Sequence, residues 1–255
     1  MFISTKGEWS EVKNIENTCK NIYNKGEKVI KKAIKRITAM ILAASVVLSS
    51  GFTSKAVSNP YDDVYESDWY YDSVMYVRDK GAMTGVNATH FAPGENLQRQ
   101  DFALALMRRY ISQGHTVTQK DDGTYYGKAV AWAKDMKIMT GYLNGDFGVG
   151  DVITRQDCIT ALDRYVDACG LIRVSEVEDP YYFTKMEQFK TTYADVDQLR
   201  DYSYSIMYVA VMNDKLITGV ERDGVKYLEP NGLVTRGMIS VMLERWFEEY
   251  GEYGI

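Results

Sequence analysis

Three copies of one sequence pattern constrain this chain more than any other feature. Each copy contains a Met/Ile-Thr-Gly tripeptide, an aromatic residue fifteen positions before its glycine, and an arginine 14, 14 or 17 positions after it. The glycines are Gly85, Gly141 and Gly219; the aromatic residues are Tyr70, Tyr126 and Tyr204; the arginines are Arg99, Arg155 and Arg236. Such an internal repeat predicts a fold built from repeated units.

The spacing of apolar residues predicts two helices in each unit. After each arginine, apolar side chains recur mainly at positions +3, +6, +7 and +10, which is the stripe of an amphipathic helix. We expect first helices near 69–80, 125–136 and 202–214, and second helices near 99–113, 155–169 and 236–250. Each glycine is expected to supply a positive-φ turn or to allow a close backbone approach.

One helix-loop-helix unit cannot bury its own apolar face, whereas three together can. The prediction is therefore an all-α, pseudo-threefold helical bundle. The repeats are expected at 57–114, 115–170 and 193–255. The acidic, tyrosine-rich segment 171–192 between the second and third repeats is expected to be a surface insertion, with a short helix or a protein-binding role open to it.

Residues 1–56 form a basic leader followed by an apolar run. Nine basic residues precede position 37, the run from Ile37 to Phe52 is uncharged, and Ser54 and Ala56 follow as small residues. This order is typical of a secretory signal peptide cleaved after Ala56. The run is short for a bilayer span. An uncleaved N-terminal anchor is the alternative; after cleavage no stable membrane span is expected, and the protein is expected to be secreted.

Charge and composition exclude several function classes. Residues 57–255 hold 20 basic and 31 acidic side chains, a net charge of −11, which argues against nucleic-acid binding. Two histidines and three cysteines leave little material for a metal site. The sequence contains no recognisable catalytic set, phosphate loop or dinucleotide motif. We therefore expect no enzyme activity, no cofactor and no metal.

The repeats resemble the S-layer homology domain. The shared elements are the aromatic-x-Asp-Val motif at 61–64 and 193–196, Trp-Tyr at 69–70, Phe-x-Pro at 91–93, and the Thr-Arg helix start at 154–155 and 235–236. The second repeat lacks Asp-Val, and Met238 stands where the third repeat should have an acid. The resemblance covers almost all of 61–248.

The resemblance implies a bundle that anchors its protein to the bacterial cell wall or S-layer surface. Its ligand in that family is a secondary cell-wall polysaccharide, typically ending in a pyruvate-ketal sugar that carries a carboxylate. Guanidinium groups suit a carboxylate, and a helix N-terminus favours an anion. We therefore expect ligand contacts from Arg99, Arg155 and Arg236, with a structural salt bridge to a neighbouring repeat as the alternative.

Further candidate residues are open to two interpretations each. Sugar stacking or core packing is expected for Trp69, Tyr70, Tyr126 and Tyr204. Hydroxyl contacts or helix capping are expected for Asp63 and Asp195, and Gly85, Gly141 and Gly219 should lie near the grooves. Two rival functions are a helical-repeat module that binds another protein and a glycan hydrolase with two convergent acids.

Overall fold

The computed structural model describes residues 59–170, 182–213 and 216–251. The leader and signal peptide expected at 1–56 lie outside these described residues. Each repeat contains the two expected helices. The first helices are α2 (Tyr71–Asp79), α4 (Gly127–Asp135) and α7 (Asp201–Tyr208), and the second helices are α3 (Arg99–Ser112), α5 (Arg155–Ala168) and α8 (Arg236–Gly251).

The second helices begin where the sequence supplies a cap or a fixed loop. Thr154 precedes α5, and its side-chain oxygen accepts a hydrogen bond from the Asp157 N–H at 3.3 Å. Thr235 does the same for Met238 at 3.3 Å. Such caps satisfy backbone donors that have no partner within the helix. These caps fix Arg155 and Arg236 at the first turns of α5 and α8, whereas Gln98, which precedes Arg99 in α3, makes no side-chain cap.

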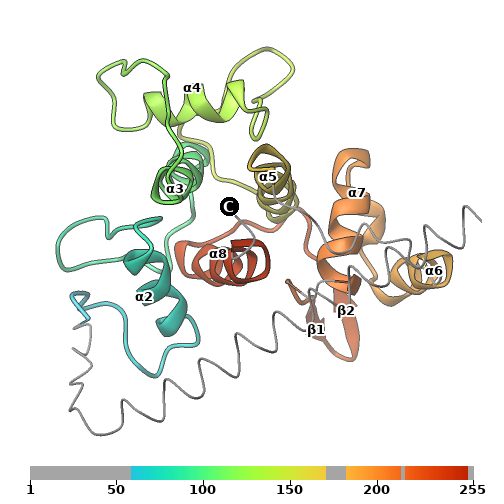
Figure 1. Ribbon diagram of the computed structural model, residues 1–255. Helices are drawn as coiled ribbons and strands as arrows, with labels where there is room; N and C mark the ends of the chain where they lie inside the picture. The colour runs from blue at the N-terminus through green and yellow to red at the C-terminus, as the bar shows by residue number, and fades with distance from the viewer. Residues whose placement is uncertain (1–58, 171–181, 214–215, 252–255) are drawn as a thin grey trace, which may run out of the picture. The chain divides into compact units, whose positions relative to one another are not determined.

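The helices pack in a cyclic order. Each first helix lies against the second helix of the preceding repeat, giving the pairs α4 with α3, α7 with α5, and α2 with α8. Figure 1 shows the three second helices at the centre and the three first helices outside them. Because the third repeat closes onto the first, the expected pseudo-threefold arrangement is present.

A ring of backbone hydrogen bonds joins the three repeats at their centre. The Leu97 N–H donates to the Val234 carbonyl (2.8 Å), Ile153 donates to Leu97 (3.0 Å), and Val234 donates to Ile153 (3.3 Å). All three side chains are buried. Backbone groups buried away from water need such partners, so this ring sets the relative position of the repeats.

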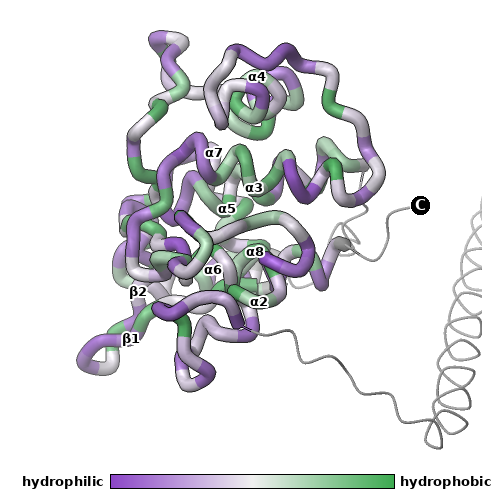
Figure 2. The backbone as a smooth tube through the Cα atoms, turned by 90° about the vertical axis from the view of Figure 1, so that its left-hand side faces the viewer, coloured by the Kyte–Doolittle hydropathy of each residue, from purple (hydrophilic) through white to green (hydrophobic). Residues whose placement is uncertain are grey.

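The apolar stripes of the second helices form the core. Leu106, Leu162 and Leu243 occupy the same helical position and have no exposed surface, as predicted. Larger side chains fill the space between repeats: Trp132 lies against the Tyr110 ring of repeat 1, and Tyr165 lies against the Phe247 ring of repeat 3. Figure 2 shows hydrophobic residues recurring along these helices.

The third repeat departs from a purely helical unit. The loop that holds its three extra residues forms a hairpin of β1 (Val220–Arg222) and β2 (Val225–Tyr227), turned by Asp223 and Gly224 at positive φ. The hairpin lies at the edge of the molecule in both views (Figures 1 and 2). The fold is therefore mostly helical, with one small antiparallel sheet.

Part of the expected insertion belongs to the core. Helix α6 (Tyr182–Thr192) places Phe189, which is fully buried, against the rings of Tyr193, Tyr204 and Tyr208 at 5.7 Å each. The expected short helix is thus present, and its described side chains are mostly exposed apart from Phe189; residues 171–181 lie outside the described residues. A short 3-10 helix, η2 (Val196–Gln198), leads into α7.

The three motif glycines share a close approach to other atoms. A Cβ on Gly85 would lie 2.7 Å from the Tyr61 ring, and one on Gly219 would lie 2.6 Å from the Tyr193 ring. At Gly141 a Cβ would lie 2.4 Å from the Asp146 carbonyl oxygen, and φ is +84°. Close packing is thus the common reason for glycine, and a positive φ is needed only at Gly141.

Candidate functional site

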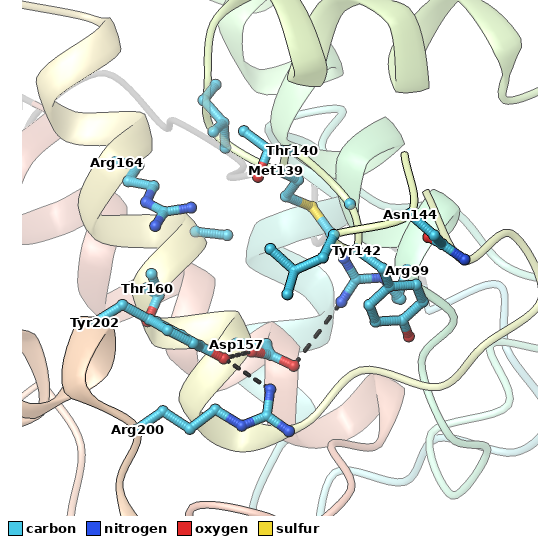
Figure 3. Close-up of a pocket in the computed structure, with 14 residues that line it drawn as sticks. Arg99, Met139, Thr140, Tyr142, Asn144, Asp157, Thr160, Arg164, Arg200 and Tyr202 are labelled. Carbon is cyan, nitrogen blue, oxygen red and sulfur yellow. Dashed lines mark hydrogen bonds and ion pairs between the residues drawn. The ribbon is translucent and has the colours of Figure 1, made fainter. Parts of the chain in front are cut away.

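A groove of about 820 Å³ lies where the three repeats meet beside Arg99. We call it groove A. Repeat 1 contributes Arg99, repeat 2 contributes residues 138–144 and one face of α5, and repeat 3 contributes Arg200 and Tyr202. Figure 3 shows these side chains around the groove. The volume lies within the range of ligand pockets in proteins.

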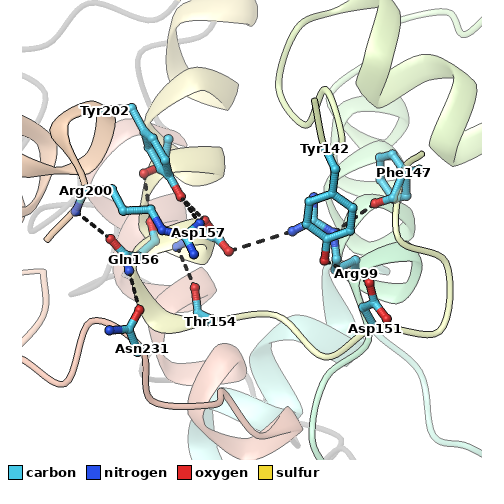
Figure 4. Close-up of polar contacts among 11 residues, drawn as sticks. Arg99, Tyr142, Phe147, Asp151, Thr154, Gln156, Asp157, Arg200, Tyr202 and Asn231 are labelled. Carbon is cyan, nitrogen blue, oxygen red and sulfur yellow. Dashed lines mark hydrogen bonds and ion pairs between the residues drawn. The ribbon is translucent and has the colours of Figure 1, made fainter. Parts of the chain in front are cut away.

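Arg99 forms one wall of groove A and is bound mainly by its neighbour repeat. Its Nε donates to the Phe147 carbonyl at 2.9 Å, its guanidinium lies 4.9 Å from the Tyr142 ring centre, and Nη1 lies 3.8 Å from Asp157. Arg99 is only 7% exposed. Figure 4 shows this set of contacts. The expected inter-repeat role is present, and it is made mostly through a carbonyl.

A chain of hydrogen bonds crosses the opposite side of groove A. Arg200 Nη1 donates to the Tyr202 hydroxyl (3.0 Å), which donates to Asp157 (2.5 Å). Partial burial and this bond to a carboxylate raise the pKa of Tyr202. Gln156 accepts from the Arg200 backbone N–H at 3.0 Å and donates to Asn231 at 2.7 Å. These contacts hold Arg200 at the groove edge (Figure 4).

Groove A is locally positive on an acidic protein. The described residues that line it include three arginines, Arg99, Arg164 and Arg200, and one acid, Asp157. Thr140 and Asn144 add polar groups, and Met139 and Leu143 add apolar surface. This combination of apolar surface, a few polar groups and clustered guanidiniums suits a sugar that carries a negative charge.

A second groove repeats the arrangement one step around the bundle. Groove B, of about 330 Å³, is lined by Arg236 of repeat 3, residues 82–86 and Arg108 of repeat 1, and Tyr125 of repeat 2. The Tyr125 hydroxyl donates to Asp101 at 2.9 Å, as Tyr202 does to Asp157. Groove B has two arginines and one acid among its described lining residues.

The third junction, which is formed by Arg155 of repeat 2 with residues of repeats 3 and 1, differs from grooves A and B. Arg155 is buried and donates to the Thr218 carbonyl at 2.6 Å, but its Nε has no partner among the described residues. Burial lowers the pKa of Arg155. Met238 stands where grooves A and B have aspartate, and Trp69 stands where they have tyrosine. The hydrogen-bonded Asp–Tyr pair therefore cannot form at this junction.

The position expected for Tyr204 is corrected by a π-helix. Residues 209–213 form this π-helix, η3, which adds one residue relative to the other first helices. The Leu216 N–H consequently donates to Ala210, six residues back, where Ala82 donates to Val77, five back. The counterpart of Tyr125 is thus Tyr202. Tyr204 lies edge-on to Phe189 in the core.

The remaining aromatic candidates are split between surface and packing. Trp69 is 68% exposed, with its ring 5.2 Å from Tyr70. Tyr70 is half-buried and lies against Gly237. Tyr126 is likewise half-buried, beside Tyr125 at 5.0 Å. Neither Tyr70 nor Tyr126 is among the described residues that line groove A or B, which favours packing for both.

Asp63 and Asp195 do not cap helices. Asp63 accepts from the N–H groups of Phe91 and Ala92 at 2.8 and 2.7 Å, and Asp195 accepts from Leu228 and Glu229 at 2.7 and 2.8 Å. Ala92 and Glu229 have positive φ. Each carboxylate therefore holds a strained loop, which corrects the helix-capping interpretation; contacts with sugar hydroxyls stay a prediction.

The sequence analysis missed several residues that line the grooves. Tyr125, Tyr202 and Arg200 lie next to expected positions, and the aspartates follow the motif arginines by two positions. The recurrence of arginine nine positions after Arg99 and Arg155 was visible in the sequence as Arg108 and Arg164. Their spacing placed them on the helix, but not on its groove face.

Comparison with known proteins identifies the class that the repeats define. The family model of the S-layer homology domain matches residues 60–103 and 118–157. Two segments of the chain, 60–103 and 118–157, are therefore S-layer homology repeats. Segment 193–251 makes the same loop and glycine contacts as the first matched repeat, and the Nε of Arg236 donates to a carbonyl of the next repeat as that of Arg99 does. Domains of this family anchor proteins to the cell wall.

Two curated relatives share part of the chain. One is a surface-layer 125 kDa protein of Lysinibacillus sphaericus, 29% identical over 135 residues, which are 47% of this chain and 11% of the relative. Another is an endoglucanase of Bacillus sp. (strain KSM-635), 27% identical over 124 residues, which are 47% of this chain and 13% of the relative. The chain thus spans only a small part of either relative.

Within the part of the chain that the structure describes, the helices are too short or too polar to cross a lipid bilayer. The same residues contain no cluster of three or more His, Cys, Asp or Glu side chains that could hold a metal ion.

Proposed function

We propose that this protein attaches non-covalently to the bacterial cell surface by binding an anionic, pyruvylated secondary cell-wall polysaccharide in groove A. The observation that carries the proposal is the concentration of three arginines around one groove of a protein whose residues 57–255 have a net charge of −11. Attraction to a carboxylate requires such local clustering, because the overall field of the protein repels an anion.

The comparisons support attachment as the role of the shared segment. The two relatives bear the names of different proteins, a surface-layer protein and an endoglucanase. Each match covers 47% of this chain, more than residues 1–58 can account for, so both must include part of the repeats. A segment common to unlike proteins is better explained by shared attachment than by either protein's own activity.

The site chemistry also favours binding over hydrolysis, so we propose that the protein is not an enzyme. Glycoside hydrolysis commonly needs two carboxyl groups about 5–10 Å apart. Asp157 is the one carboxylate among the described lining residues of groove A, and it is already bound by Tyr202. Release of reducing sugar from wall glycan, abolished by Asp157→Asn, would contradict this part of the proposal.

Co-sedimentation with purified cell-wall sacculi tests the attachment. The protein should sediment with intact sacculi and stay in the supernatant after the secondary polysaccharide has been extracted. Sedimentation should weaken as salt concentration rises, because the ligand charge is screened. Equal sedimentation with intact and extracted sacculi would contradict the proposal and point to a protein or peptidoglycan partner.

A further inference from the structure

We infer that Arg164 and Arg200, and not the motif residue Arg99, select an acidic glycan in groove A. The inference rests on the proposed function and names the residues that recognise the ligand's charge. It depends on which guanidinium groups remain accessible in the groove once the protein has folded: Arg200 is exposed, Arg164 is half-buried and Arg99 is buried.

Arg99 presents little accessible surface to a ligand. Its Nε is held by the Phe147 carbonyl, its face by the Tyr142 ring, and its Nη1 lies near Asp157. Only 7% of its surface is exposed, and its guanidinium face is covered by the Tyr142 ring. Its role is to build the groove wall.

Arg164, in contrast, is not held by polar contacts with other described side chains. It lines groove A from the third turn of α5, is half-buried, and makes no hydrogen bond or ion pair with another described residue. At the same helical position, Arg108 donates to the Thr84 hydroxyl and Arg245 donates to the Leu216 carbonyl. All five guanidinium donors of Arg164 are therefore open to a ligand in the groove. Figure 3 shows its side chain beside the groove.

Arg200 is held in position and still has hydrogen-bond donors available to a ligand. Its backbone N–H donates to Gln156, and one guanidinium donor binds the Tyr202 hydroxyl. Four guanidinium donors remain available. The equivalent residues of the other repeats are Ser67 and Gly123, which carry no charge. Groove A thus has a cation at a position where groove B has none. Because Arg200 and Arg164 come from different repeats, a ligand that binds both must lie across the repeat junction.

The test compares native wall polysaccharide with the same polysaccharide after its carboxyl groups have been reduced. Calorimetry would measure binding of each to the parent protein, to Arg164→Gln and to Arg200→Gln, because glutamine keeps a polar side chain and removes the charge. Arg245→Gln is the matched control, since it occupies the Arg164 position in repeat 3 and lies outside the lining of grooves A and B. Melting temperatures would confirm that all variants fold.

We expect the parent to prefer the native polysaccharide. Each groove variant should lose about 10- to 100-fold in affinity for it and keep its affinity for the reduced form, while Arg245→Gln should match the parent. If the parent discriminates and folded Arg164→Gln and Arg200→Gln discriminate equally well, the inference is wrong. If the parent binds both forms equally, the proposal of glycan binding is supported and the inference that Arg164 and Arg200 select an acidic glycan is wrong. If it binds neither, the proposed function fails too.

Discussion

At the scale of single residues, the motif arginines connect the repeats. Arg99, Arg155 and Arg236 each donate to a backbone carbonyl of the next repeat in the cycle. Burial lowers the pKa of Arg236 and Arg155, because the charged form loses contact with water. A buried guanidinium of this kind is expected to matter for stability before it matters for a ligand.

Arg236→Ala should therefore destabilise the protein. It removes hydrogen bonds to the carbonyls of Phe91 (2.8 Å) and Thr84 (2.7 Å) and leaves these acceptors without that partner. The expected cost is about 3 kcal/mol, or a melting temperature lower by roughly 6–12 °C. Thermal denaturation checks this, with Arg245→Ala as an exposed control. A variant that melts like the parent but no longer binds wall glycan would show that Arg236 serves the ligand instead.

At the scale of elements, the sequence predicted where the helices lie. It did not always predict which side chain occupies a given position of a helix. The 3.6-residue periodicity placed all six repeat helices within a few residues, because each must bury one apolar stripe. The extra residue in η3 has no such signature, so counting back from Gly219 selected Tyr204, whereas the structural counterpart of Tyr70 and Tyr126 is Ser203. Asp63 and Asp195 likewise serve loops whose geometry depends on residues about 30 positions away.

The equivalence of the second helices has a direct energetic consequence. Leu106→Ala, Leu162→Ala and Leu243→Ala should each cost about 2–5 kcal/mol, from lost burial and the cavity left behind. Thermal melts of the three variants should show similar losses, because all three side chains are fully buried. One leucine whose replacement leaves the melting temperature unchanged would show that its repeat is packed differently from the other two.

At the scale of the whole molecule, the three repeats form a closed cycle in which each completes the next. The central backbone ring and the helix pairs both follow the order 1, 2, 3 and back to 1. Each groove accordingly takes residues from all three repeats. The sequence predicted the repeats and their number, but the partner of each side chain across a junction depends on this closure. For that reason Arg200 could not be assigned to a groove from its own repeat.

Tyrosines with raised pKa values at the junctions between repeats predict that the protein loses stability at alkaline pH. Burial raises the pKa of Tyr165, whose hydroxyl donates to Gln113 at 2.7 Å; partial desolvation raises the pKa of the more exposed Tyr202 and Tyr125 as well. The unfolded chain then releases these protons first, at about pH 10. The stability is fully present below that pH and is lost as pH rises further.

Urea unfolding between pH 8 and 11.5 would measure this effect. The free energy of unfolding should fall above about pH 10, and Tyr165→Phe should show a shallower fall than the parent. An identical slope in both proteins would mean that the Tyr165 hydroxyl does not contribute.

The central claim is that an acidic wall glycan binds in groove A. Backbone chemical-shift mapping by NMR, during titration with a purified fragment of the secondary cell-wall polysaccharide, tests it most directly. The account predicts saturable shifts that cluster on residues 138–144, Arg164 and 200–202, and that weaken with salt. Shifts confined to another face of the bundle, or none at a fragment concentration that saturates sacculi binding, would contradict it.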